Sequence, residues 1–305
     1  MGKEKYFLAF DIECSQTFGG PHEICLFGYV KTDSLLNEVG SGEIYVKANR
    51  PQGRVKKLLK NVDFEKVVKA PGYEHQHDII SDILNSENTI LVAHSGDSDL
   101  RFMYLQNERY GLENFSGSLL DTFLLVRERY QSMENYGVIG LTEAWRIGHE
   151  LEHDALSDAR SCIDFIRHIC EEDNITPLQL YEKYKDTACV KSEIVYRDID
   201  RQRIIREVKK MAVDEAPPGT VCFCFDFPFE KAKRADTTGR LAEMIIKAGG
   251  AITFRAPKFD YIIADEGSES KRIWYAVNIA GAKAITPDEV EDLITKNGMN
   301  LKTVG

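Results

Sequence analysis

The sequence lacks any long apolar run. Its longest uncharged stretches are only about ten residues, as at 216–225, whereas a membrane-spanning helix needs roughly 20 apolar residues. The sequence also lacks a C-x-x-C pair, and its seven cysteines are odd in number. These absences exclude a transmembrane protein and a disulfide-stabilised scaffold, and they predict a cytoplasmic protein with reduced cysteines.

An excess of positive charge is also absent. The chain has 39 basic and 49 acidic residues, and residues 1–170 carry a net charge of −8 of the total −10. This excludes a protein held on a polyanion mainly by its overall charge. One basic cluster lies within the acidic residues 1–170. We favour a solvated helix face as its explanation over a surface that guides a polyanionic strand. Its members are Arg50, Arg54, Lys56, Lys57, Lys60, Lys66 and Lys69.

A length of 305 residues is more than one compact domain usually takes, so we expect two. Pro217-Pro218-Gly219 marks a boundary, and the highly charged stretch before it has little regular hydrophobic spacing. We therefore predict one domain at 1–170, a helical charged linker at 171–216 and a second domain at 217–305.

Hydrophobic spacing predicts an α/β fold for both domains. In the first domain, three opening strands precede alternating helices and strands, which favours a mixed sheet flanked by helices. The main elements are strands at 6–10, 23–30, 43–46 and 89–93 and helices at 73–84, 141–147 and 155–170. In the second domain, strands and helices alternate over about ninety residues, which favours a small parallel sheet.

Four acidic residues stand at or near the ends of these elements. Asp11 and Glu13 end the first predicted strand, and side chains two apart on a strand point the same way. Asp99 and Asp158 each lie near the start of a helix. A solvent-facing acid at a helix start is the ordinary explanation for either residue alone. The combination and order of the four instead indicate a divalent-metal site.

The surrounding residues resemble the three motifs of the DEDDh 3′–5′ exonucleases, the family of the epsilon proofreading subunit of bacterial DNA polymerase III. The third motif, a histidine five residues before an aspartate, is the most specific, and the resemblance covers roughly residues 5–170. It implies an RNase H-like fold. The motifs are Phe10-Asp11-Ile12-Glu13, Val92-Ala93-His94-Ser95-Gly96-Asp97-Ser98-Asp99 and His153-Asp154-Ala155-Leu156-Ser157-Asp158.

The resemblance implies phosphodiester hydrolysis with two Mg²⁺ or Mn²⁺ ions, which suit a site of hard oxygen ligands. Asp11, Glu13 and Asp158 would hold the ion that binds the attacking water. Asp11 and Asp99 would place the second ion at the leaving oxygen. His153, with an ordinary pKa of about 6.5, would accept the proton of the water.

A competing motif shares the same histidine. Residues 149–153 read H-E-L-E-H and match the H-E-x-x-H zinc-protease motif, which needs His149 and His153 on one continuous helix. Gly148 is predicted to end the preceding helix, so we disfavour this interpretation. His75 and His77 are expected to be ordinary residues at an exposed helix start.

Residues 219–297 resemble a BRCT domain, a module that binds phosphate groups or partner proteins. The resemblance rests on Val221-Cys-Phe-Cys-Phe225, Ala248-Gly249-Gly250-Ala251 and Ser270-Lys271. Lys271 matches a phosphate-binding lysine of such domains. Asp226 stands at or next to the position of a phosphate-binding hydroxyl, where a carboxylate would repel a phosphate.

The sequence therefore predicts a 3′–5′ exonuclease acting on single-stranded or frayed DNA in replication or repair, with DNA favoured over RNA because of the BRCT-like part. A polymerase or repair protein could dock on that part, and no membrane partner is expected. Two alternatives stay open. One is a 3′–5′ exoribonuclease, and the other is a catalytically weak nuclease that serves as a BRCT binding scaffold.

Overall fold

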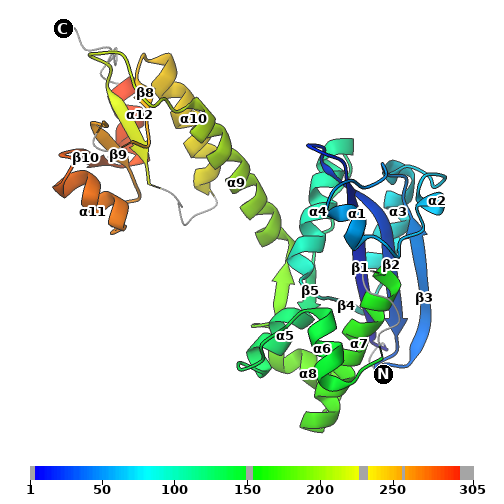
Figure 1. Ribbon diagram of the computed structural model, residues 1–305. Coiled ribbons are helices and arrows are strands. Elements are labelled where there is room, and N and C mark those ends of the chain that lie inside the picture. Colours follow the sequence, from blue (N-terminus) through cyan, green and yellow to red (C-terminus); the bar gives the residue numbers. More distant parts are fainter. Residues whose placement is uncertain (1–3, 149–153, 227–232, 256–257, 296–305) are drawn as a thin grey trace. The chain divides into compact units, whose positions relative to one another are not determined.

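The computed structural model describes residues 4–148, 154–226, 233–255 and 258–295. The chain divides into two compact units, Met1–Tyr196 and Arg197–Gly305, which are drawn in Figure 1. The division falls inside one helix, α9 (Ser192–Met211). Among the described helices, none combines the length and apolar composition that crossing a bilayer requires.

The first unit is built on a six-stranded mixed sheet in the order β3-β2-β1-β4-β5-β6. The β1-β2, β2-β3 and β5-β6 pairs are antiparallel, while β1-β4 and β4-β5 are parallel. The strands are β1 (Tyr6–Gln16), β2 (His22–Thr32), β3 (Glu38–Tyr45), β4 (Thr89–Ala93), β5 (Ser118–Asp121) and β6 (Cys189–Lys191). The predicted mixed sheet is confirmed.

Helices cover both faces of this sheet. Alternate residues of β1 serve the two faces: Phe7 and Ala9 pack with α5, α6 and α7, whereas Leu8 and Phe10 pack with α3 and α4. The helices are α1 (Val55–Leu58), α2 (Phe64–Val67), α3 (Tyr73–Leu84), α4 (Gly96–Tyr110), α5 (Thr122–Arg129), α6 (Val138–Trp145), α7 (Ala155–Asp173) and α8 (Pro177–Tyr184).

Helix α6 and strand β6 of the first unit differ from the sequence prediction. The helix α6 ends at Trp145, and Arg146 follows in the left-handed region with a φ of 56°, so Gly148 is not its stop. Strand β6 comes from the segment predicted as a linker, yet Val190 pairs with Leu119 of β5. A three-residue edge strand carries too little alternation to be recognised from sequence.

The second unit has a four-stranded parallel sheet in the order β10-β9-β7-β8, which confirms its predicted class. Its strands are β7 (Cys222–Phe225), β8 (Ala251–Ile252), β9 (Tyr261–Ile263) and β10 (Lys283–Ile285). One apolar cluster joins the sheet to α9, α10 (Lys233–Lys247) and α12 (Pro287–Thr295), and a second joins it to α11 (Lys271–Asn278). The identity of this unit as a BRCT domain stays a prediction.

Candidate active site

Asp11 and Glu13 lie on β1, on the face that packs against α7. Both follow Phe7 and Ala9 by even numbers of residues, so their side chains point to the same side of the sheet. The prediction that they end the strand was wrong, because β1 continues to Gln16. The pairing with β2 does change there: the register shifts between Glu13 and Cys14, at an irregularity of the bulge type.

The helix α7 brings the third carboxylate, Asp158, to this pair. Its first turn lies directly on β2, since a Cβ atom built on Gly28 would be 2.4 Å from the carbonyl carbon of Ala155. Glycine at this position is therefore what allows the close approach. Carboxylate oxygens of Asp11, Glu13 and Asp158 consequently lie within 4.8 Å of one another.

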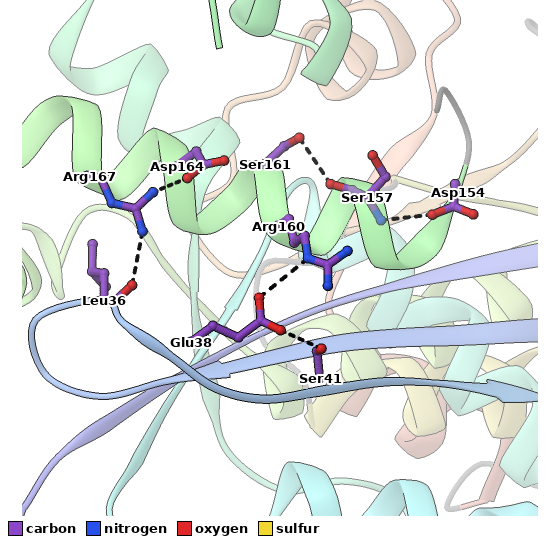
Figure 2. Close-up of polar contacts among 9 residues, drawn as sticks. All are labelled: Leu36, Glu38, Ser41, Asp154, Ser157, Arg160, Ser161, Asp164 and Arg167. Atoms are coloured by element: carbon purple, nitrogen blue, oxygen red, sulfur yellow. Dashed lines mark hydrogen bonds and ion pairs between the residues drawn. The ribbon is translucent and has the colours of Figure 1, made fainter. Parts of the chain in front are cut away.

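Polar contacts anchor α7 along the β2-β3 hairpin (Figure 2). Nε of Arg160 lies 3.5 Å from Oε2 of Glu38, and Arg167 donates to the carbonyl oxygen of Leu36 at 3.0 Å. At the start of the helix, the side chain of Asp154 accepts a hydrogen bond from the amide of Ser157 at 2.9 Å. The helix position that carries Asp158 is thus held by its own cap and by two arginines.

Asp99, the fourth predicted carboxylate, lies in the first turn of α4 and is not one of the three whose oxygens lie within 4.8 Å of one another among the described residues. Its side chain is buried, and its Oδ2 has no hydrogen-bond partner among the described residues. Burial raises its pKa well above the ordinary range, and the charges of Asp11 and Asp121 raise it further. A buried, unpartnered carboxylate oxygen that is electrostatically coupled to Asp11 suits a cation ligand.

Asp121, which the sequence analysis did not single out, has a supporting role at the turn before Asp99. Its carboxylate accepts hydrogen bonds from the amides of Ser95 at 3.1 Å and Gly96 at 2.9 Å, and from Phe123 at 2.9 Å. Ser95 is held there in the left-handed region, with a φ of 63°. One side chain therefore ties the β4-α4 turn, which sets the position of Asp99, to the start of α5.

Mutual repulsion marks the site electrostatically. Burial raises the pKa of Asp11 to about 7, with a further contribution from Asp154. Burial also raises the pKa of Glu13 to about 9, helped by the charges of Asp11, Asp158 and Asp154. Each group disfavours ionisation of the next, which is the expected behaviour of a carboxylate cluster without a countercharge. The donor set consists of hard oxygen atoms and fits Mg²⁺ or Mn²⁺.

The sequence analysis gave no role to Asp154, which lies near the cluster. Asp154 caps α7 and raises the pKa of Asp11, and its charge also raises the pKa of Glu43 on β3, after the larger effect of burial. The position of Asp154 beside His153 was the available signal for it. His153, His149 and the H-E-x-x-H run lie outside the described residues, so the roles assigned to those histidines stay predictions.

Metal should stabilise this protein in a pH-dependent way. The folded-state pKa of Asp11 is raised from 3.8 to about 7, so the folded protein retains a proton that the unfolded chain releases. The stability of the metal-free protein from this group therefore falls as the pH rises from about 4 to 7. Mn²⁺ competes with that proton, so the increase in Tm that it causes should be larger at pH 8 than at pH 5.5. At 100 times the Kd, the bound ion should raise the free energy of unfolding by roughly 2.7 kcal/mol.

Thermal unfolding with EDTA or Mn²⁺ measures this effect. Asp11→Asn should raise the metal-free Tm at pH 8 and remove most of the Mn²⁺ response. Asp82→Asn, at an exposed position of α3, is the matched control and should behave like the wild type. An unchanged Mn²⁺ response in Asp11→Asn would contradict the metal site.

In the second unit, Asp226 directly follows β7, and its side chain contacts Ser270, the N-cap residue of α11. Ser270 donates a hydrogen bond from its hydroxyl to Oδ1 of Asp226 at 2.9 Å, and the same hydroxyl accepts the amide of Ile273. Arg272 donates to the carbonyl oxygen of Phe225 at 3.2 Å. The carboxylate of Asp226 is buried, so the neighbourhood of Lys271 already holds an internal anion.

Comparison with known proteins gives matches to the first unit. Residues 8–165 match the family model RNase_T, described as Exonuclease. The chain is 27% identical over 170 residues to the PolC-type DNA polymerase III of Caldanaerobacter subterraneus, which covers 55% of this chain and 12% of that protein. It is 37% identical over 75 residues to the PolC-type enzyme of Lactococcus lactis, covering 25% and 5%. The chain thus spans about a tenth or less of the length of these relatives.

Solved structures of nucleases resemble the fold at low sequence identity. Exonuclease I in complex with the inhibitor BCBP has a TM-score of 0.50 at 15% identity, over 70% of this chain and 47% of that one. The nuclease domain of 3′hExo, a DEDDh family member bound to rAMP, has a TM-score of 0.49 at 14% identity, over 56% and 94%.

Proposed function

The chain belongs to the RNase T family of exonucleases, which are metal-dependent phosphodiester hydrolases, and we propose that it removes nucleotides from the 3′ ends of single-stranded or frayed DNA in replication or repair. One observation carries the proposal. The family fold gathers Asp11, Glu13 and Asp158 within 4.8 Å of one another and buries Asp99 in electrostatic contact with Asp11.

The roles of these residues follow from their chemistry. Asp11, Glu13, Asp99 and Asp158 would hold two divalent ions, which supply a nucleophilic water near neutral pH and stabilise the charge that develops on the phosphate. His153 would accept the proton of the attacking water. Asp121 and Asp154 act on other residues: Asp121 positions the turn before Asp99, and Asp154 starts the helix of Asp158.

DNA is favoured over RNA by the kind of relative that the sequence matches. The relatives in Caldanaerobacter and Lactococcus are DNA polymerases, although the match spans only a small part of each. The predicted BRCT-like unit would provide docking for a polymerase or a repair protein. The internal anion at Asp226 supports a docking role that does not require a phosphate group.

The substrate is tested with matched 5′-labelled DNA and RNA oligonucleotides, in Mg²⁺ and in EDTA. We expect a ladder of products shortened from the 3′ end, formed faster from DNA and abolished by EDTA. Faster shortening of RNA would instead favour the exoribonuclease. Absence of hydrolysis of either strand by the wild type, with metal bound, would favour the scaffold.

A further inference from the structure

The segment 50–69 has a charge opposite to that of the rest of its unit. It contains seven basic and two acidic residues, whereas residues 1–170 as a whole have 18 basic and 26 acidic ones. Solvation alone explains one or two exposed lysines. The packing and the neighbours of this segment favour a function for the rest of its charge, in place of the solvated helix face that the sequence alone favours.

Packing turns this charge outward. Leu59, Val62 and Val67 are buried against Leu26 of β2 and Ala155 of α7, so the apolar side of the segment faces the sheet. The charged side borders two hollows of the surface. One lies at the C-terminal end of β3, and we call it the β3 groove. It is lined by Glu43, Ile44, Tyr45, Asp63, Glu65, Lys66, Lys69, Ala70, Pro71 and Gln76.

Sheet register connects the β3 groove to the carboxylate cluster. Glu13 pairs with Leu26, and Leu26 pairs with Tyr45. Residues directly opposite each other in antiparallel strands share a face, so Tyr45 points to the side of the sheet that carries Glu13. Two strand spacings place their Cα atoms on the order of 10 Å apart.

A second set of paired residues also connects the β3 groove to the carboxylate cluster. Asp11 pairs with Gly28, and Gly28 pairs with Glu43, which lines the β3 groove. The pKa of Glu43 is raised by burial and by the charge of Asp154, the residue that caps α7. One end of the β3 groove therefore lies within electrostatic range of the site.

The β3 groove is lined by three acids, of which Glu65 has an ion-pair partner, and by two exposed lysines. Asp63 accepts hydrogen bonds from the amides that begin α2, and Glu65 is paired with Arg50. Nζ of Lys66 lies over the ring of Tyr45, 5.0 Å from its centre. Burial raises the pKa of Glu43, and the charge of Lys66 lowers it in part, so Lys66 also interacts with this acid. Lys69 forms no ion pair within the described part of the chain.

We propose that the β3 groove binds the phosphate backbone of the single-stranded substrate, on the 5′ side of the bond to be cleaved, through Lys66 and Lys69. This assignment rests on the proposed function, since it names the path of the strand that enters the same site. Two cations on the side of the carboxylate cluster offset the repulsion that the acidic unit exerts on a polyanion. Contacts to phosphate are independent of base sequence and depend on salt.

Binding without hydrolysis is the direct test. The wild type and Lys66→Gln/Lys69→Gln are titrated into a labelled 20-nucleotide dT strand in EDTA, between 50 and 200 mM salt. Each phosphate contact on a single strand contributes about 0.7 to the slope of log K against log salt, so the slope should decrease by about 1.4. At the low end of the salt range, the Kd should increase at least about tenfold.

Control variants of the same chain distinguish a phosphate contact in the β3 groove from an effect of overall charge and from a loss of folding. Lys209→Gln/Lys210→Gln removes two exposed charges from α9 and should bind like the wild type, while Lys66→Arg/Lys69→Arg should keep both affinity and slope. In Mg²⁺, the glutamine variant should raise KM for the 20-mer and leave kcat near that of the wild type.

Two outcomes would overturn the proposal. One is wild-type affinity and slope in Lys66→Gln/Lys69→Gln, and the other is an equal loss in the α9 control. Because binding is measured in EDTA, an inactive wild type would refute the nuclease assignment without affecting this result.

Discussion

Replacing Asp11 with asparagine is expected to reduce hydrolysis by about 10³-fold or more. Asp11 is central to the cluster, since it lies near Glu13 and Asp158 and is electrostatically coupled to Asp99. Metal-bound stabilisation of phosphate charge contributes several kcal/mol, and about 4 kcal/mol corresponds to 10³ in rate. Initial rates on a 5′-labelled oligonucleotide at saturating Mg²⁺ measure the loss.

Asp99→Asn and Asp158→Asn should show losses of similar size, because Asp158 lies within 4.8 Å of Asp11 and Asp99 interacts electrostatically with Asp11. Asp97→Asn is the matched control. Asp97 lies in the first turn of α4 as Asp99 does, but its side chain is exposed, so the rate should remain near that of the wild type. Any of the three cluster variants that kept a wild-type rate would remove that residue from the site.

His153→Ala should lower the rate by about 10²–10⁴-fold while leaving metal binding intact. The proposed base accepts a proton but is not a metal ligand, so the increase in Tm caused by Mn²⁺ should persist in this variant. An imidazole with its ordinary pKa of about 6.5 makes the wild-type rate fall as the pH decreases below that value. The variant should lose this acid limb, which a purely structural role for His153 would not cause.

His149→Ala distinguishes this prediction from the zinc-protease interpretation. Only His153 belongs to the exonuclease motif, so the His149 variant should keep a nearly unchanged rate and pH profile. If both histidines were required to retain a tightly bound zinc ion, the H-E-x-x-H motif would be the correct interpretation. Metal analysis of the purified wild type and both variants gives the answer.

Local chemistry was enough to recognise several elements. The strand Thr89–Ala93 and the helix Tyr73–Leu84 agree with the sequence prediction at both ends, because an apolar run or a helical spacing is interrupted sharply at their limits. The helix Pro177–Tyr184 begins at a local sequence signal, where Thr176 and Gln179 form a reciprocal capping box. Such signals are contained within a few residues.

Contacts between segments far apart in the chain could not be predicted from local sequence patterns. Strand β6 forms because Val190 pairs with Leu119 on the adjacent strand β5, and its three residues alone do not predict a strand. The hydrogen bond from Ser270 to Asp226 joins residues 44 positions apart. The sequence predicted that a carboxylate would stand near the phosphate position, but not which hydroxyl it would bind.

By itself, the sequence determined the fold class, because alternation and helical spacing are properties of short stretches, and the order of its motifs predicted the four acidic residues. Only the tertiary structure decided how these residues act together. The close approach of Ala155 to Gly28 brings Asp158 to β1, and the carboxylate of Asp121 holds the turn before Asp99. The register of three strands then places Tyr45 and Lys66 on the side of the cluster. Repulsion among carboxylates depends on distance and burial, and both arise only when segments far apart in the chain pack together.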